Sequence, residues 1–287
     1  MNHRPEWIKT TAPRGTSAEE GVKEILSSQN LNTVCREADC PNQGECWGEG
    51  TATFMLLGKL CTRNCRFCDV AAGNPNGEVN EDEPKRIKKA VRDLELDYVV
   101  LTSVDRDDLP DGGAGHFRDT VNLIRKIPDP PLVEVLIPDF SGETSSLKMI
   151  KESGVEVVGH NIETVERLTS RVRDPRAGYQ LSLSVLEKVK ELDSGLVTKS
   201  SIMVGLGENK REVVKTMEDL KRAGVDIVTI GQYLRPTEAQ LPVEKFWKRS
   251  EFENLKVIGN KLGFSGVVSG PFVRSSYKAK ETYLKAR

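Results

Sequence analysis

The stretch TATFMLLGKLCTRNCRFCDV, residues 51–70, joins an apolar run of strand length to three closely spaced cysteines. The run at 51–58 is short and apolar, as expected for a parallel strand that is covered on both faces. Cys61, Cys65 and Cys68 follow it with the spacing C-x3-C-x2-C. Barrel enzymes keep their active sites in the loops that follow their strands, so we expect these cysteines to lie in a functional loop.

From residue 51 onward, the chain alternates apolar runs with charged stretches of helical periodicity. We predict six strands, at 51–58, 97–104, 132–138, 155–163, 196–207 and 226–234. The stretches between them predict helices at 83–96, 115–127, 145–154, 181–195 and 209–224. This alternation is typical of a parallel sheet, and no GxGxxG follows the first strand. The sequence therefore predicts an α/β fold, a partial (β/α)6 barrel rather than a dinucleotide-binding sheet.

Composition excludes several classes of protein. The 287 residues include 42 Lys plus Arg and 43 Asp plus Glu, a net charge of −1, which argues against a nucleic-acid binder driven by bulk charge. No apolar run approaches the roughly 18 residues that span a bilayer, so we expect no membrane segment. The first thirty residues lack the apolar segment of a secretory signal. We therefore expect a cytoplasmic protein whose cysteines are ligands or catalytic thiols rather than disulfides.

All six cysteines lie in one short part of the chain, in two sets of three. The set at 61–68 can bind three irons of a cubane cluster and leave the fourth iron open, whereas structural zinc usually takes four ligands. The second set has the spacing C-x4-C-x5-C and consists of Cys35, Cys40 and Cys46. Two incomplete sets favour two iron–sulfur clusters. The alternative is a zinc loop that takes a further ligand from elsewhere in the chain.

The set at 61–68 resembles the signature of the radical S-adenosylmethionine enzymes, both in its spacing and in Phe67 before the last cysteine. The resemblance implies a 4Fe-4S cluster on Cys61, Cys65 and Cys68. In that family the open iron binds the amino and carboxylate groups of S-adenosylmethionine. One-electron reduction then cleaves the sulfonium and gives a 5′-deoxyadenosyl radical.

Two further motifs resemble the lipoyl synthases within that superfamily: CPNQGECW at 40–47 and GPFVRSSYKA at 270–279. The resemblance implies an auxiliary 4Fe-4S cluster, held by the second cysteine set and by Ser276 as an unusual oxygen ligand. From the residues alone, 274–277 would be a polar strand end at the surface. An alkoxide is a hard donor on a soft site, so its bond should be weak, as suits a cluster that comes apart.

The resemblance also implies an activity and its partners. The expected reaction inserts two sulfur atoms at C6 and C8 of an octanoyl chain on a lysine of a carrier protein. It consumes two S-adenosylmethionine molecules, and the auxiliary cluster donates the sulfur. The implied partners are an octanoylated lipoyl carrier protein or lipoyl domain and an electron donor such as ferredoxin or flavodoxin. We further expect an apolar barrel interior, which gains about 0.8 kcal/mol for each methylene that it buries.

Polar residues after three of the predicted strands are candidate contacts of S-adenosylmethionine. By the resemblance these are Asp105, Arg106 and Asp107 in TSVDRDDLPDGGAGHF, Asn161 and Glu163 in HNIET, and Glu208 in SSIMVGLGE. Ser201 and Met203 depart from the Gly and Ile that are usual in the family. The alternatives are an ordinary turn for the acidic loop and a buried, hydrogen-bonded histidine for His160. Arg173 in RVRDPRAGYQ could bind a carboxylate or lie in a solvated loop.

We expect three regions: an N-terminal extension at 1–50 with the auxiliary-cluster cysteines, the barrel at 51–240, and a C-terminal extension at 241–287. The C-terminal extension begins with a predicted helix near 243–262 and ends in a charged tail. Two other functions stay open. One is another two-cluster radical enzyme, such as a methylthiotransferase or a biotin-synthase-like enzyme, against which the RSSY sequence argues. The other is a zinc-dependent scaffold protein.

Overall fold

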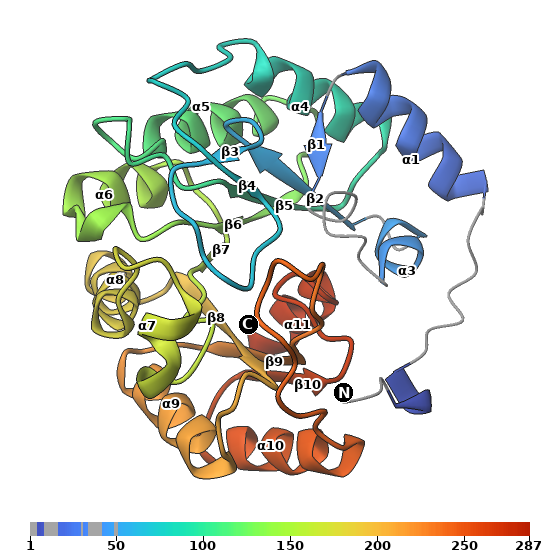
Figure 1. Cartoon of the computed structure of the whole chain (residues 1–287). Coiled ribbons are helices and arrows are strands. Elements are labelled where there is room, and N and C mark those ends of the chain that lie inside the picture. The colour runs from blue at the N-terminus through green and yellow to red at the C-terminus, as the bar shows by residue number, and fades with distance from the viewer. Residues whose placement is uncertain (1–4, 9–16, 30, 34–41, 49–50) are drawn as a thin grey trace.

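The computed structural model describes residues 5–8, 17–29, 31–33, 42–48 and 51–287 (Figure 1). Cys35 and Cys40 lie outside these ranges. One curved sheet has the strand order β1-β2-β5-β6-β7-β8-β9-β10, in which β1 is antiparallel and the others are parallel. Its strands are β1 Asn32–Thr33, β2 Thr51–Leu56, β5 Tyr98–Ser103, β6 Leu132–Leu136, β7 Val157–Gly159, β8 Val197–Val204, β9 Ile227–Gln232 and β10 Gly266–Gly270.

The partial barrel is confirmed, and each of the six predicted strands is present. β7 is shorter than its predicted range of 155–163. The sheet also continues into the segment that we assigned to the C-terminal extension, because β10 pairs with β9 along its whole length. A strand of five residues that includes two glycines gives little local signal. Close packing favours glycine at position 266, where a Cβ atom would lie 2.9 Å from the Thr282 side chain.

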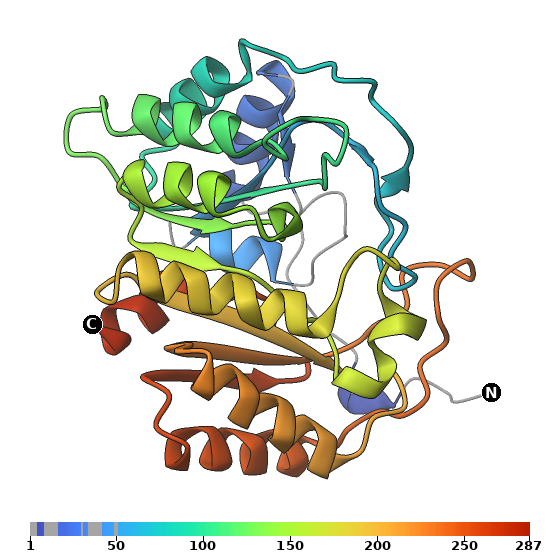
Figure 2. The same ribbon diagram turned by 90° about the vertical axis from the view of Figure 1, so that its left-hand side faces the viewer.

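Helices cover the outer face of the curved sheet (Figures 1 and 2). They are α4 Glu83–Asp93, α5 Ala114–Ile124, α6 Thr144–Glu152, α8 Tyr179–Leu192, α9 Lys210–Arg222 and α10 Arg249–Lys261, whereas the short α7 Thr169–Val172 lies at the end of the barrel that carries the cysteine loop. The charged tail that ends the sequence forms a helix, α11 Ala279–Ala286. This helix forms because Ala279, Thr282 and Tyr283 share one buried face.

The two faces of the sheet bury different residues. Val99 and Val133 pack outward into a core that includes side chains of α4, α5 and α6. Tyr98 and Val157 point the other way and cluster with Tyr283 of α11, which closes the amino-terminal end of the barrel. The expectation of an apolar interior is wrong in part, since Glu134 and Lys199 are buried there as an ion pair.

The N-terminal and C-terminal segments meet near the open edge of the barrel. The side chain of Asn42, just before α3 Gln43–Gly48, donates to the carbonyl of Phe272 at 2.7 Å. The Tyr277 hydroxyl lies 3.2 Å from the Glu45 carboxylate. α1 Ser17–Ser28 precedes these elements in the chain. Within the described ranges, no helix has both the length and the apolar character to cross a membrane.

Candidate functional site

The cysteine loop leaves the carboxyl end of β2, and its three thiols are free. Cys61 lies in the short strand β3 Leu60–Cys61, which pairs with β4 Ala71–Ala72. Each sulfur accepts a backbone hydrogen bond: Cys61 from Arg63 N at 3.4 Å, Cys65 from Asp174 N at 3.3 Å, and Cys68 from Val70. Such bonds favour the thiolate form and help to set the potential of a bound cluster.

The electrostatics of the loop oppose free thiolates. Burial raises the pKa of Cys61 to about 11, with a further contribution from Asp105, and raises the pKa of Cys65 to about 12. Burial also raises the pKa of Cys68. A positively charged metal centre must therefore replace the protons. Among the described residues, no three His, Cys, Asp or Glu side chains converge as one zinc ion requires. A cubane cluster needs no such convergence, because each thiolate binds its own iron, so these residues fit a 4Fe-4S cluster.

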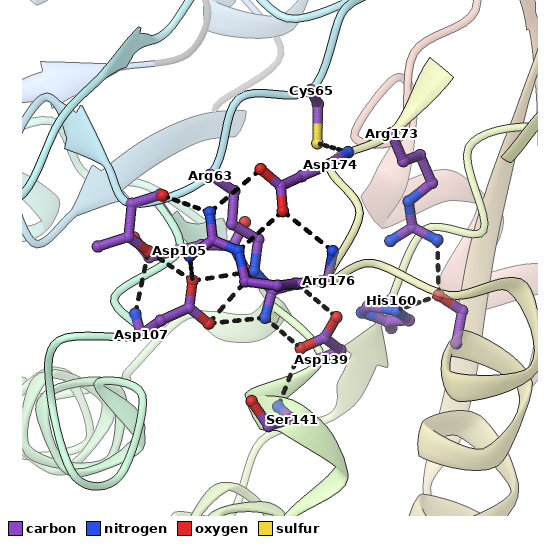
Figure 3. Close-up of polar contacts among 12 residues, drawn as sticks. Arg63, Cys65, Asp105, Asp107, Asp139, Ser141, His160, Arg173, Asp174 and Arg176 are labelled. Atoms are coloured by element: carbon purple, nitrogen blue, oxygen red, sulfur yellow. Dashed lines mark hydrogen bonds and ion pairs between the residues drawn. The ribbon is translucent and has the colours of Figure 1, made fainter. Parts of the chain in front are cut away.

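Arg63, between the first two cysteines, is the centre of a buried ion-pair cluster (Figure 3). Its guanidinium is 2.7 Å from an Asp139 oxygen, 2.8 Å from Asp107 and 3.3 Å from Asp105. Asp105 and Asp107 follow β5 and Asp139 follows β6, so one arginine fastens the loop to the ends of two strands. Burial alone would raise the pKa of Asp139, but its hydrogen bonds from Arg63 lower it.

Arg176 extends this cluster from the segment after α7 (Figure 3). It donates to the carbonyl of Thr62 at 2.6 Å and pairs with Asp174 at 2.8 Å, while Asp174 accepts the backbone N–H of Asn64 at 2.9 Å. The stretch 171–178, part of the RVRDPRAGYQ sequence, thus contacts the cysteine loop instead of forming a solvated loop. We missed Arg63, Asp139, Asp174 and Arg176. The one available signal was the excess of acids after β5, which requires a cation.

Replacing Arg63 by methionine should destabilise the fold by about 3–5 kcal/mol, because it leaves the buried Asp139 carboxylate without its cation. Urea unfolding measures this, and the iron content after anaerobic reconstitution should fall as well. The matched control is Arg171→Met, which removes an exposed guanidinium paired with the exposed Glu244 and should cost about 1 kcal/mol or less. Equal losses in the two variants would contradict the central role of Arg63.

The acidic-loop candidates divide into two groups. Asp105 and Asp107 lie in the Arg63 cluster, and an Asp105 oxygen is 3.8 Å from Cys61 Sγ. Burial raises the pKa of Asp105 to about 6 against the opposing effect of Arg63. Arg106 instead points to the base of the cysteine loop. It donates to the carbonyls of Glu78 at 2.8 Å and Leu57 at 3.4 Å, near the two ends of the loop, and pairs with Asp108.

The HNIET candidates lie together after β7. Glu163 has a φ of 67°, a left-handed conformation that is strained for a residue other than glycine. Its carboxylate accepts from Asn161 Nδ2 at 3.1 Å, and burial raises its pKa. Its charge also raises the pKa of Cys68, although burial is the larger cause. His160 is a buried, hydrogen-bonded histidine, as the alternative interpretation predicts, since its ring bonds Ile137 O and Ser182 Oγ at 2.9 Å each.

Arg173 is buried rather than solvated. It donates to Ser182 Oγ at 2.8 Å and to the carbonyl of Ile162 at 3.4 Å, while its Nε atom has no hydrogen-bond partner among the described residues. Its charge lowers the pKa of Cys65, and it also acts on Glu163. Figure 3 shows it on the side of the loop next to Cys65. A buried cation with an unused donor is suited to bind an anionic group.

Glu208 lies apart from these groups. Its carboxylate accepts the backbone N–H groups of Gly205 at 2.6 Å and Leu206 at 2.9 Å, and Trp247 Nε1 at 2.9 Å. Within the described residues these bonds hold the turn after β8 against the segment before α10. The structure therefore does not bring Glu208 together with the cysteine loop through any described contact.

A second candidate site lies near the open edge of the barrel. A small cavity there is lined by residues of β2, of α3 and of the turn after β10. They include Thr51, Thr53, Cys46, Arg274, Ser276 and Tyr277. The structure thus brings Cys46 and Ser276 to one cavity, although 230 positions separate them in the sequence. Asn42 and Phe272, which are joined by a hydrogen bond nearby, are also 230 positions apart.

The comparisons with known proteins agree with this geometry. The sequence model of the radical SAM superfamily matches residues 55–220. The chain is 52% identical to the lipoyl synthase of Deinococcus radiodurans, over 98% of this chain and 85% of that protein. It is 51% identical to the lipoyl synthase of Pyrobaculum arsenaticum, over 100% of this chain and 97% of that protein.

Solved structures share the fold at low sequence identity. The FeFe-hydrogenase maturase HydG from Carboxydothermus hydrogenoformans matches 93% of this chain and 69% of its own, with a TM-score of 0.61 and 13% identity. Methylornithine synthase (PylB) matches 88% of this chain and 84% of its own, with a TM-score of 0.56 and 14% identity. The fold, the cysteine loop and the relatives lead to one assignment: the chain belongs to the lipoyl synthase family of the radical SAM superfamily.

Proposed function

We propose that this enzyme inserts two sulfur atoms, at C6 and C8, into an octanoyl group that is amide-linked to a lysine of a lipoyl carrier protein or lipoyl domain. The observation that carries the proposal is the cavity shared by Cys46 and Ser276. The reaction needs a sulfur source inside the barrel, separate from the cysteine loop. This cavity is where residues from both extensions could hold one.

Cys61, Cys65 and Cys68 would hold the first cluster. When bound, a 4Fe-4S cluster with S-adenosylmethionine at its open iron supplies the 5′-deoxyadenosyl radical needed to break an unactivated C–H bond. The chain's own residues orient that centre. Arg63 fixes the loop, and the amides of Arg63, Val70 and Asp174 direct hydrogen bonds at the sulfurs. An electron donor such as ferredoxin or flavodoxin would supply one electron for each S-adenosylmethionine.

The S-adenosylmethionine site would lie between the cysteine loop and the ends of β5 and β7. Arg173 would bind the carboxylate of the ligand through its unused Nε donor. Asn161 and the strained Glu163 would bind its hydroxyl and amino groups, because their side chains meet at 3.1 Å next to the loop. Asp105 and Asp107 would act through the Arg63 cluster. Arg106 and Glu208 would keep the surrounding loops in place.

Replacing Arg173 by glutamine should raise the Kd for S-adenosylmethionine at least about tenfold, since hydrogen bonds to charged groups are worth about 1.5–3 kcal/mol. Equilibrium binding to the reconstituted enzyme measures this, and Arg173→Lys should recover part of the affinity. Arg171→Gln is the matched control, because Arg171 is exposed and pairs with Glu244. Unchanged affinity in Arg173→Gln would remove the assignment of this arginine to the ligand.

The second cluster would be a substrate, held by Cys35, Cys40, Cys46 and Ser276. For each C–S bond, one hydrogen atom would leave carbon and become part of 5′-deoxyadenosine, and one sulfide of the cluster would bond to the carbon radical. The bonds of that sulfide to iron would break, and the remaining electron would pass to ferric iron of the cluster. The sulfide must lie at contact distance, because a carbon radical is otherwise quenched. A hard oxygen ligand on one iron would make this cluster easier to dismantle than one with four thiolates.

The test is an anaerobic reaction of the reconstituted enzyme with an octanoyl-lysine peptide, S-adenosylmethionine and a reductant. Mass spectrometry should show two added sulfur atoms per peptide, and about two molecules of 5′-deoxyadenosine should form per product. A methylthiolated product would instead favour a methylthiotransferase. A colourless protein with stoichiometric zinc would favour a scaffold.

A further inference from the structure

Three buried polar side chains meet inside the barrel, away from the cysteine loop. Lys199 Nζ of β8 is 2.8 Å and 3.1 Å from the two Glu134 oxygens of β6, and the Tyr98 hydroxyl of β5 donates to Glu134 at 2.7 Å. Lys199, Glu134 and Tyr98 are 3%, 2% and 0% exposed, respectively. Nothing in the proposed reaction at the cysteine loop uses them. We name Tyr98, Glu134 and Lys199 the floor cluster.

The floor cluster lies on the inner face, toward the amino ends of the strands. Tyr98 is the first residue of β5, and its ring contacts Tyr283 of α11, with ring centroids 6.4 Å apart. The opposite end of β5 leads into Asp105 beside the cysteine loop. In Figure 2 the cysteine loop and the C-terminal helix lie at opposite ends of the barrel. At about 3.3 Å per residue, the five steps from Tyr98 to Ser103 give the interior a depth of about 16 Å.

The cavity of Cys46 and Ser276 borders this cluster. Thr51 and Thr53 line the cavity, and Thr51 is the direct register partner of Tyr98 on the neighbouring strand. A carbon that receives sulfur from a donor in this cavity therefore lies one strand away from Tyr98. C8 is the last carbon of an octanoyl chain, so a longer chain would have to continue toward the buried ion pair.

We propose that the floor cluster sets the upper limit on acyl-chain length, by closing the inner face of the barrel just beyond C8. The inference rests on the proposed function and deepens it by naming specificity residues. A buried ion pair cannot yield to added methylenes, because separating its partners leaves a charge without compensation. Apolar residues in the same places would instead allow a longer chain to be buried.

The test compares octanoyl-lysine and decanoyl-lysine peptides as substrates, with the release of 5′-deoxyadenosine as the assay and the ratio of their kcat/KM values as the result. Because two further methylenes find no apolar space, the wild type should favour the octanoyl peptide. The triple variant Tyr98→Phe, Glu134→Leu, Lys199→Met removes both charges and the hydroxyl that bonds Glu134. If this variant buries the two methylenes, the ratio of kcat/KM values should shift toward the decanoyl peptide by about fifteenfold relative to the wild type. Lys280→Met is the control, since it removes the exposed ion pair between α11 and Asp97, which lies outside the floor cluster, and should keep the wild-type preference.

Two results would overturn the inference: equal use of both peptides by the wild type, or an unchanged preference in a triple variant that still processes the octanoyl peptide. The wild-type comparison needs no variant, so equal use of the two peptides would overturn the inference even if the triple variant does not fold. Thermal unfolding of each variant identifies that case. If the wild type adds no sulfur to the octanoyl peptide, the proposed function itself is contradicted. Failure of the proposed function and failure of the chain-length inference therefore give different results.

Discussion

Replacing Ser276 by alanine should abolish the sulfur-inserted product, by at least about a hundredfold, while S-adenosylmethionine cleavage continues. The reason is spatial: Ser276 lines the cavity near the barrel edge together with Cys46, whereas Cys61, Cys65 and Cys68 lie in the loop after β2. A loss of one oxygen ligand should affect the sulfur donor alone. The measurements are 5′-deoxyadenosine formation and the mass of the octanoyl-lysine peptide in the same reaction.

Ser275→Ala is the matched control, because it removes the neighbouring hydroxyl and should leave product formation within about twofold of the wild type, as surface substitutions usually do. Ser276→Cys tests the chemistry further, since a thiolate is a softer and stronger ligand for iron. That variant should keep its cluster and release sulfur poorly. Full lipoylation by Ser276→Ala would remove the serine from the ligand set.

Changing Cys61, Cys65 and Cys68 together to alanine should end S-adenosylmethionine cleavage and reduce the iron count from about eight to about four per chain, since each 4Fe-4S cluster carries four irons. The three sulfurs each accept a backbone hydrogen bond in one loop, so we expect them to act as one ligand set. Anaerobic determination of iron, acid-labile sulfide and zinc measures the change.

Cys46→Ala is the complementary variant. It should lose the irons of the other cluster and keep S-adenosylmethionine cleavage, because Cys46 lies in α3 and contributes to the other cavity. Four irons in a fully reconstituted wild type would mean that the enzyme lacks its proposed sulfur source. Stoichiometric zinc with little iron would contradict radical chemistry.

The sequence allowed the parallel sheet and the cysteine loop to be predicted because both depend on local patterns. The strands at 51–58 and 97–104 are apolar runs bounded by charged, helical stretches, and burial on both faces makes such a run a strand wherever it occurs. The triplet at 61–68 lies within eight residues, so its ability to bind one cluster does not depend on distant parts of the chain. The functional family followed from these short motifs.

Only the tertiary structure decided which charged groups and which weakly predicted elements find stabilising partners far away in the sequence. By sequence, Arg63 is an ordinary residue between two cysteines, and only the parallel pairing of β5 with β6 brings Asp107 and Asp139 together around it. Arg173 is equally consistent with a solvated loop until the chain after α7 folds over the cysteines. β10 and α11 have weak local signals, and they form because pairing with β9 and packing on Tyr98 stabilise them.

The same distinction applies to the barrel interior. The sequence determined that strands would be buried, that six cysteines would cluster, and that a radical enzyme would result. It could not show that Glu134 and Lys199 would face each other across β7, because their pairing depends on strand order and register, which join residues 65 positions apart. Local periodicity predicts which residues are buried, whereas the partner of a buried charge is determined only when the strands pair in the sheet.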